Sequence, residues 1–546
     1  MHLQSLLNKK TVSQLINRVN MKEQPRQRVS HVLAPLSLLC LALAGCTVGP
    51  DFARPDVAAN ADYSKEKLTT TAQADIDTGG AAQRLIAGMD IPGQWWTLFR
   101  SPALNALVEE ALKANPDVSA AQAALRQANE LIYADQASLF PSVSGNVQKA
   151  REKVSGVTSG VPQSPILTVS SASLSVSYAP DVFGGTRRQI ESTTAQAEYQ
   201  RFQLEATYLT LTANVVNTAI SLASVRDQIA STEEIIRLQG GQLDLLQAQR
   251  RLGAIGDSDV LTQQTALAQT RATLPPLQKQ LAQTRNQLMA YLGRFPNQDQ
   301  GERFNLASLR LPEELPVSLP SAIVGQRPDV RSAEAQLHQA SANIGVAVAN
   351  QLPQFSITGS LGSTVASGTK LFSSGSGVWS LAGSITQPIF DAGALEHRKR
   401  AAVAAYDESA ARYRGTVVTA FQDVANALRA LEADADALNQ QVVAERSAQA
   451  NLDLVQAQFR LGAVAYINLL TAQQTYQNTA LSRVKAQAAR YSDTTALFQA
   501  LGGGWWNRAD VNPDTKGSPD RFGLPSWQEI MPAKSKAAPA DAARLN

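Results

Sequence analysis

Few side chains in this sequence of 546 residues have the chemistry of an active site. It holds four His and two Cys, and only His338 and His397 lie beyond the first 45 residues among the histidines. No cluster of His, Cys and carboxylates has the spacing of a zinc site. Since catalysis needs titratable groups that converge, the sequence predicts that the protein is not an enzyme and binds no cofactor or metal.

Motifs for nucleotides and nucleophiles are missing as well. Neither GxSxG, a P-loop nor the dinucleotide-binding glycine pattern occurs. The stretch FGGTRR from Phe183 could open a phosphate-binding helix, but it more simply ends a strand-like run and begins a long helix. A net charge of +3 leaves no basic surface of the kind that binds nucleic acid.

The N-terminus predicts a lipid anchor. A basic stretch after Met21 leads into HVLAPLSLLCLALAGC, an apolar run too short to cross a bilayer as a helix. Its last four residues resemble a bacterial lipobox. We therefore expect residues 1–45 to be a signal peptide that starts at Met21, and Cys46 to carry acyl chains. An ordinary signal peptide with an incidental Cys is the alternative. Thr47 stands where lipoproteins kept at the inner membrane commonly have Asp, which favours the outer membrane.

The chain repeats itself once. RLGA begins at Arg251 and again at Arg460, 209 positions later, and NPDV from Asn115 returns as RPDV from Arg327. A period near 200 residues is too long for a solenoid and indicates a duplicated domain. The expected division is an irregular segment at 46–100, repeats at 101–300 and 301–506, and a disordered tail at 507–546.

Long helices dominate each repeat. Apolar residues recur four and three positions apart between Leu204 and Leu246, and no Pro interrupts 188–252. This 3.5-residue period predicts a helix roughly 100 Å long that supercoils against its neighbours. A plain coiled coil without any channel fits the same periodicity.

Each long helix is expected to form a hairpin with a return helix. Gly253 and Gly462 suit left-handed C-caps, and the return helices are predicted at 259–292 and 468–500. We expect Asp257, Ser258 or Asp259 to cap the first return helix. Pro275–Pro276 should break or bend it near its middle.

Four segments alternate apolar and polar residues with a period of two, as transmembrane β-strands do. They lie at about 141–150, 166–179, 354–364 and 377–387. Four strands cannot close a barrel, and an open edge in lipid leaves amides unpaired. Three copies would supply twelve strands. Surface hairpins on a soluble domain are the alternative.

Together these segments resemble the TolC-like outer-membrane factor family, and most closely its lipoprotein branch in tripartite efflux systems, the OprM and NodT type. The matching stretches include CTVGPDFARP at Cys46, WWTLFRSPALNALVEEALKANPDV at Trp95, the paired FGG/FDAG and RLGA turns, and LGGGWW at Leu501. They cover about residues 46–506. The resemblance implies a mainly α fold with a membrane β-barrel. A duplicated helix-hairpin/β-hairpin unit would form a homotrimeric 12-stranded β-barrel, continued by a 12-helix periplasmic coiled-coil tunnel.

The implied function is a passive exit duct in the outer membrane of a Gram-negative bacterium. Small molecules would reach it from an inner-membrane transporter of RND type through a periplasmic adaptor (membrane fusion) protein. The alternatives are the outer-membrane channel of type I protein secretion, and a lipid-anchored structural coiled coil of the periplasm. The sequence does not name the exported substrate.

The resemblance also assigns the adaptor-docking tips. They comprise Arg251, Leu252, Gly253 and Ala254, and Arg460, Leu461, Gly462 and Ala463. Relatives often place Asp just past the second tip, as an anionic constriction, but the stretch from Asn468 to Thr471 has no carboxylate. Asp257 and Asp259 are the candidates for an entrance charge; their alternative role is that of solvated helix caps.

Overall fold

The computed structural model describes residues 47–55, 62–63, 68–153, 166–301, 304–318, 320–366 and 371–508. The expected signal peptide, Cys46 and the tail from residue 509 lie outside the described residues. The chain divides into two compact units. The sheet unit comprises Met1–Gly49, Ser138–Arg188 and Gly345–Glu396, and the helical unit comprises Pro50–Ala137, Gln189–Ile344 and His397–Asn546.

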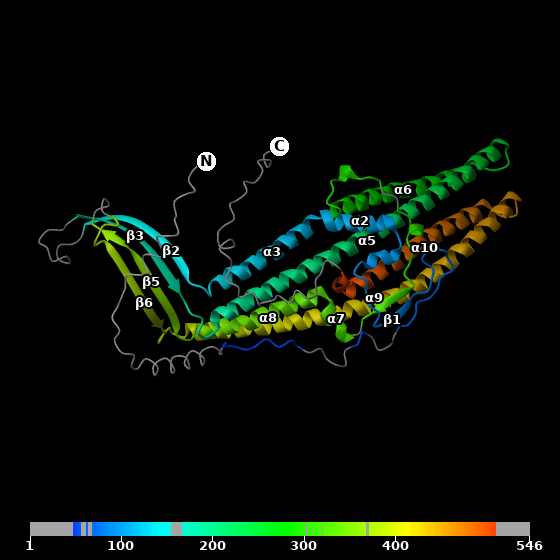
Figure 1. The fold of residues 1–546 in the computed structure, drawn as a ribbon. Coiled ribbons are helices and arrows are strands. Elements are labelled where there is room, and N and C mark those ends of the chain that lie inside the picture. Colours follow the sequence, from blue (N-terminus) through cyan, green and yellow to red (C-terminus); the bar gives the residue numbers. More distant parts are fainter. Residues whose placement is uncertain are drawn as a thin grey trace, which may run out of the picture. The chain divides into compact units, whose positions relative to one another are not determined.

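The sheet unit holds one antiparallel sheet with the order β2-β3-β5-β6 (Figure 1). Its strands are β2 (Ser142–Lys153), β3 (Ile166–Tyr178), β5 (Gln354–Val365) and β6 (Gly377–Thr386). They lie where the period-two alternation predicts strands. The pairing of β3 with β5 joins the two repeats into one sheet. Among the described strands, β2 and β6 each have one partner, so both outer edges are open.

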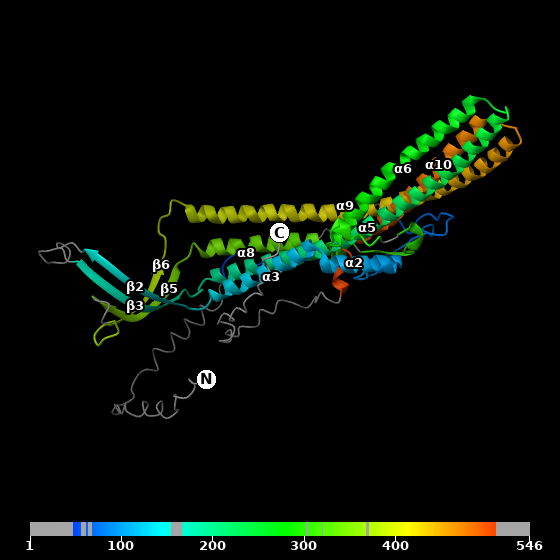
Figure 2. The ribbon, with the colours of Figure 1, turned by 90° about the horizontal axis from the view of Figure 1, so that it is seen from above.

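The helical unit is built around two long hairpins. They are α5 (Gly185–Arg251) with α6 (Asp257–Tyr291), and α9 (Ala394–Arg460) with α10 (Tyr466–Ala500). α5 and α9 have 67 residues each, α6 and α10 35 each. Each element of the second hairpin begins 209 positions after its counterpart in the first, which is the offset of the sequence repeat. Figure 2 shows the tip-bearing halves of both hairpins running together.

Of the expected break or bend at Pro275–Pro276, the break is wrong, because both prolines lie inside an uninterrupted α6. A proline inside a helix removes its own amide donor, and its ring crowds the carbonyl four residues earlier, at a cost of about 3 kcal/mol. α6 is also held on both sides of the pair by buried side chains, including Leu267 before it and Leu288 after it. Packing on the neighbouring helices therefore outweighs the local penalty.

Shorter elements complete each repeat. The first has α2 (Pro102–Ala114) and α3 (Pro116–Ala137), and the second has α7 (Pro320–Gln326) and α8 (Pro328–Ala349). The segment 46–100, expected to be irregular, contains β1 (Arg84–Ala87) and the 3₁₀ helix η1 (Trp95–Phe99). β1 pairs in parallel with β4 (Glu314–Val317) in the connection between the repeats. No local pattern in the sequence signals this long-range pairing.

The core of the helical unit combines a few aromatic side chains with many small ones. Trp95 stacks on Phe498, with ring centroids 5.3 Å apart, and Phe99 is fully buried beside Tyr491. Alanines and aliphatic residues of α5, α9 and α10 fill the rest. One stretch of α5 is apolar enough by composition to cross a membrane, yet 67% of it is buried within the protein. Its apolar character therefore serves the core.

Candidate functional site

The two hairpin tips have the same backbone geometry. Gly253 and Gly462 have positive φ angles of 75° and 72°, the left-handed conformation expected of a helix C-cap. The amide of Ala254 donates to the carbonyl of Gln249, and the amide of Ala463 donates to that of Gln458, each at 2.9 Å. These bonds, with those from the two glycines, make a Schellman motif at each tip.

The side chains of the tips are presented to solvent. Leu252 is 83% exposed and Leu461 84% exposed, although both are large apolar residues. Arg251 and Arg460 are exposed beside them, as are the two alanines that follow the glycines. One chain thus exposes two equivalent leucines, each next to an arginine, which suits contact with a partner protein.

Asp257 and Asp259 lie in the first turn of α6, but neither caps it. The N-cap is Gly256, and no side chain bonds the cap amides, so the expectation of a cap from Asp257, Ser258 or Asp259 is wrong. Asp257 instead forms an exposed ion pair with Arg250 across the tip. Because the helix starts two residues earlier than predicted, both carboxylates lie inside its first turn, near the positive end of the helix dipole.

A small apolar cluster joins the two hairpins just behind their tips. It contains Leu246 and Val260 from the first hairpin and Leu452, Tyr466 and Leu469 from the second, all buried. The ring of Tyr466 packs edge-on against Phe459, with centroids 5.8 Å apart.

Tyr466 also supplies the polar link between the hairpins. Its hydroxyl donates to the side-chain oxygen of Gln263, whose amide nitrogen donates to the carbonyl of Gln239 at 2.7 Å. Burial, and next the negative charge of Asp259, raise the pKa of Tyr466. The tyrosine therefore stays a neutral hydrogen-bond donor.

Sequence reasoning missed this link. Tyr466 stands 209 positions after Asp257, at the first residue of the equivalent helix. The signal available in the sequence was the large aromatic residue that stands in the second repeat at the position of this carboxylate, three residues after the shared RLGA turn.

The two faces of the sheet differ sharply in chemistry. One face carries exposed apolar side chains in cross-strand register: Val143 beside Val176, and Leu174 beside Leu361 and then Trp379. The other carries a hydroxyl-rich set: Ser142, Ser144, Ser173, Ser175, Ser177, Ser356, Thr358, Ser360, Ser380 and Ser384. The side chains of Ser356 and Ser384 bond at 2.7 Å. An apolar outer surface and a hydrophilic inner one are typical of a membrane barrel wall.

At the start of α5 and of α9, an Asp side chain of the preceding turn accepts hydrogen bonds from backbone amides. Asp181 accepts bonds from the amides of Thr186 and Arg187, both at 3.0 Å. Asp391 does the same for Gly393 and Leu395, and the Leu395 bond foremost lowers the pKa of Asp391. The helix N-terminus after FGG is thus occupied by an anion of the chain itself, which argues against a phosphate site there.

The first described residues lie tightly against the base of the sheet unit. The amide of Val48 donates to the carbonyl of Phe183 at 3.2 Å, and Arg188 donates to the carbonyls of Val48 and Gly49. A side chain at Gly184 would meet the backbone of Thr47 at 2.9 Å, so this approach requires glycine. Cys46, one residue upstream, lies outside the described residues.

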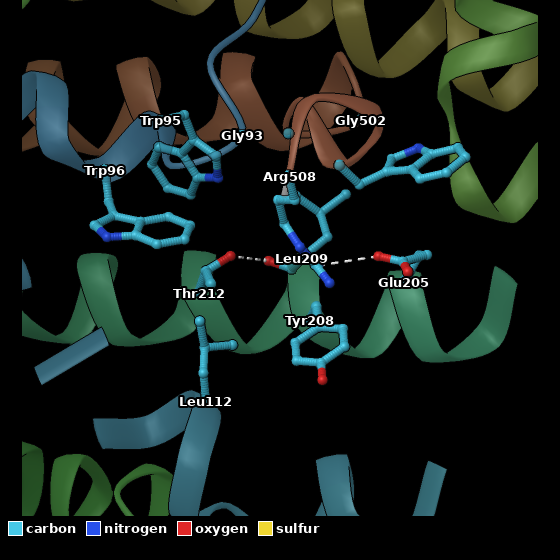
Figure 3. A pocket seen from close by; sticks show the side chains of 12 residues that line it. Gly93, Trp95, Trp96, Leu112, Glu205, Tyr208, Leu209, Thr212, Gly502 and Arg508 are labelled. Carbon is cyan, nitrogen blue, oxygen red and sulfur yellow. Dashed lines mark hydrogen bonds and ion pairs between the residues drawn. The ribbon is translucent and has the colours of Figure 1, made fainter. Parts of the chain in front are cut away.

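A small cavity lies where residues 93–96 meet the C-terminal end of the described chain (Figure 3). Its volume is about 20 Å³, and its lining includes Trp95 and Trp505. Arg508 bonds Glu205 at 3.0 Å and lies over the ring of Tyr208 at 4.2 Å. A space of this size holds about one water molecule, so it is a packing seam and not a substrate site.

The described residues contain no group of three or more His, Cys, Asp and Glu side chains placed to hold a metal ion. His338 accepts or donates one bond to Glu191 at 2.9 Å, and the ring of Phe52 stacks on it at 4.4 Å. The contact between Phe52 and His338 packs the N-terminal segment on α8.

Comparison with known proteins shows the family to which the chain belongs. A family model described as outer membrane efflux protein matches residues 107–294 and 319–503, one match in each repeat. The probable efflux pump outer membrane protein TtgC of Pseudomonas putida is 29% identical over 481 residues, which are 87% of this chain and 96% of the relative. The pyoverdine export outer membrane protein OpmQ of Pseudomonas aeruginosa is 30% identical over 452 residues, 79% of this chain and 93% of the relative.

A solved structure shows the same fold. The outer-membrane channel OprN superposes with a TM-score of 0.74 at 28% identity, over 84% of this chain and 100% of that one.

Proposed function

The chain belongs to the outer membrane efflux protein family and is an outer-membrane efflux channel, and on that premise we propose that it is the exit duct of a tripartite pump. It conducts passively. An inner-membrane transporter of RND type supplies the energy, and a periplasmic adaptor connects the two. TtgC and OpmQ are outer-membrane components named for efflux and for pyoverdine export; the cargo of this chain is a small molecule.

The open edges of the sheet carry this proposal. β2 and β6 have no second partner among the described strands, while one face of the sheet is apolar and exposed. In lipid, each unpaired backbone amide costs several kcal/mol. Three identical copies remove all six edges by pairing β2 of one with β6 of the next, which gives a closed barrel of twelve strands. A lipid-anchored coiled coil that spans no membrane would have no use for the exposed apolar face.

The long hairpins suit a periplasmic tunnel of twelve helices. Each copy brings α5, α6, α9 and α10. Because the two hairpins of one copy are pseudo-equivalent, three copies would set six similar tips in a ring. We assign adaptor docking to these tips, through Leu252 and Leu461 with their neighbouring arginines.

A lipid anchor at Cys46 fits the position of the residue after it. Thr47 is packed within a few ångström of Gly184, close in sequence to the end of β3. Acyl chains on the preceding residue would therefore enter the bilayer beside the barrel. Each buried CH₂ group adds about 0.8 kcal/mol of membrane affinity.

Asp259 is the better candidate for an entrance charge. Asp257 is paired with Arg250, whereas Asp259 is half-buried and faces the hairpin junction at Tyr466. Three copies would place three such carboxylates at the entrance, where they would favour cations and be weakened by salt.

Conductance of the purified protein in planar bilayers tests the duct. The wild-type protein should run as a heat-modifiable trimer and conduct little, because the tips are held together. The double variant Tyr466→Phe/Gln263→Ala should conduct more. A stable monomer without heat-modifiable β-structure, or a trimer that stays closed to ions in both forms, would refute the proposal.

A further inference from the structure

The charged residues of the sheet are concentrated in one place. β2, β3, β5 and β6 contain four charged side chains in all, Lys149, Arg151, Glu152 and Lys153, within the last five residues of β2. The other three strands carry none. The formation of a β-sheet does not require charged residues to gather at the end of one strand.

The pleat sorts these charges by sign. Side chains alternate between the two faces of a strand, so Lys149, Arg151 and Lys153 share the apolar face with Val143 and Val147. Glu152 projects to the serine face instead. The three cations are exposed, and none of them bonds a described residue. Successive members of this basic column stand about 7 Å apart along the strand.

The register places the basic column at the end of the apolar band, where Ile166 of β3, exposed on the same face, pairs with Lys153. Gly377, the first residue of β6, pairs with Ser363, which is in register with Ala172 and Val147. β6 therefore begins level with Val147. β2 continues for six residues beyond Val147, to Lys153, still paired with β3. The exposed apolar residues end at Val147 on β2, and the cations follow at once.

This end of the strand is the outer one under the proposed function, on which the inference rests. β2 and β3 are joined at this end by a connection of twelve residues, while their other ends lead to the helices. With the helices in the periplasm, the basic column stands where the apolar band meets the outer leaflet. Long basic side chains can keep their stems on apolar surface and reach the headgroups.

We propose that Lys149, Arg151 and Lys153 bind the phosphate groups of an outer-leaflet glycolipid of the lipid A type. Clusters of Lys and Arg next to an apolar membrane surface attract anionic headgroups, and the guanidinium of Arg151 offers a bidentate match for phosphate. The neighbouring apolar residues, Val143 and Val147, would contact the acyl chains of the same lipid.

Protection of an edge strand against aggregation is the competing role for these lysines. That role needs charge of either sign, whereas phosphate binding needs positive charge. The charge-reversed variant therefore separates the two, and the inward-facing Glu152 provides a matched control on the same strand.

The test measures binding of diphosphoryl lipid A to the full-length trimer in detergent. Lys149→Gln/Arg151→Gln/Lys153→Gln should weaken binding about 100-fold, because each basic residue near an anionic surface contributes roughly a factor of five. Glu152→Gln should stay within about twofold of the wild type. Monophosphoryl lipid A should bind the wild type more weakly and show a smaller loss in the variant.

Three results would overturn the inference. They are wild-type affinity in the triple Gln variant, retained binding in the triple Glu variant, and displacement of the lipid by millimolar inorganic phosphate, which would make free phosphate the ligand. Both variants must still run as heat-modifiable trimers and conduct. A chain that neither assembles nor conducts would instead contradict the proposed function.

Discussion

At the scale of single residues, the two repeats differ most tellingly where their helices turn back. Asp257 and Tyr466 occupy the same position in the two hairpins, yet Asp257 pairs within its own tip and Tyr466 bonds the other hairpin. Duplication supplied two equivalent tips. Divergence at this position gave the second tip a hydrogen bond to the first hairpin, from Tyr466 to Gln263, which we call the clasp.

Removal of the Tyr466 hydroxyl should loosen that clasp. Tyr466→Phe deletes the bond to Gln263 and leaves a buried amide oxygen without its donor, a change worth about 1 kcal/mol. If only the closed state holds the bond, the open population should rise about fivefold. Single-channel recordings would report this as open probability. Tyr476→Phe is the control, since the Tyr476 hydroxyl bonds no described residue; an equal effect in both variants would contradict the clasp.

The raised pKa of Asp493 should make the free energy of unfolding depend on pH. Burial raises the pKa of Asp493 to about 7, and bonding to the nearby Asp434 and its negative charge add to the effect. Since the folded protein holds the proton more firmly than the unfolded chain, whose Asp has a pKa of 3.8, stability should fall as pH rises from about 4 to 7.

Asp493→Asn should remove that loss. The variant should melt at the same temperature as the wild type near pH 4 and at a higher one at pH 8, because the amide bears no charge at either pH. Thermal melts at the two pH values measure the difference. Asp436→Asn, at an exposed position of the same hairpin, should leave the wild-type dependence intact. A constant offset at both pH values would rule out titration of Asp493 as the cause.

At the scale of elements, an N-terminal strap fastens the second hairpin. Residues 69–83 cross α9 and α10, and Arg490 of α10 is fully buried beneath them. It donates to the carbonyls of Gly79 at 2.9 Å and Ala81 at 2.7 Å, and to the hydroxyl of Thr71 at 3.0 Å. These partners are neutral, and burial lowers the pKa of Arg490 to about 10.

Arg490→Met should release the strap. The substitution leaves several buried carbonyls without donors, at a cost of about 3 kcal/mol in the free energy of unfolding. Limited proteolysis should then cut within 69–83 while the hairpins remain intact. Arg446→Met is the matched control: Arg446 pairs with Asp75 at the surface, where ion pairs contribute little to stability. Equal protease resistance in both variants would show that Arg490 does not hold the strap.

Features set by a local pattern could be predicted from the sequence, and features set by packing between distant segments could not. The helices and strands were predictable because their periods of 3.5 and 2 record which side of each element is buried. Gly253 and Gly462 were predictable because a left-handed turn selects glycine. The cap at Gly256, the unbroken helix through Pro275 and the partners of Arg490 depend on packing between segments far apart in the chain, and no local pattern records that.

At the scale of the whole molecule, the sheet can be stable in lipid only as part of something larger. Its apolar face has no cover within the described chain, and both edges are open. The hydroxyl-rich face would be costly in lipid but suits a water-filled lumen. Closure by other copies, as proposed, would resolve both problems at once, since it would pair the edges and separate the two faces into lipid and water.

Cysteine substitutions along β6 would test that separation. Trp379→Cys, Ser380→Cys, Leu381→Cys and Ala382→Cys alternate between the apolar and the hydroxyl-rich face. In intact outer membranes, a charged maleimide should label positions 380 and 382, which would face water in the proposed barrel, and spare 379 and 381, which would face lipid. After heat dissociation of the trimer in detergent, all four should react alike. Uniform labelling before dissociation would mean that the sheet lies in water on both faces, and the barrel would have to be abandoned.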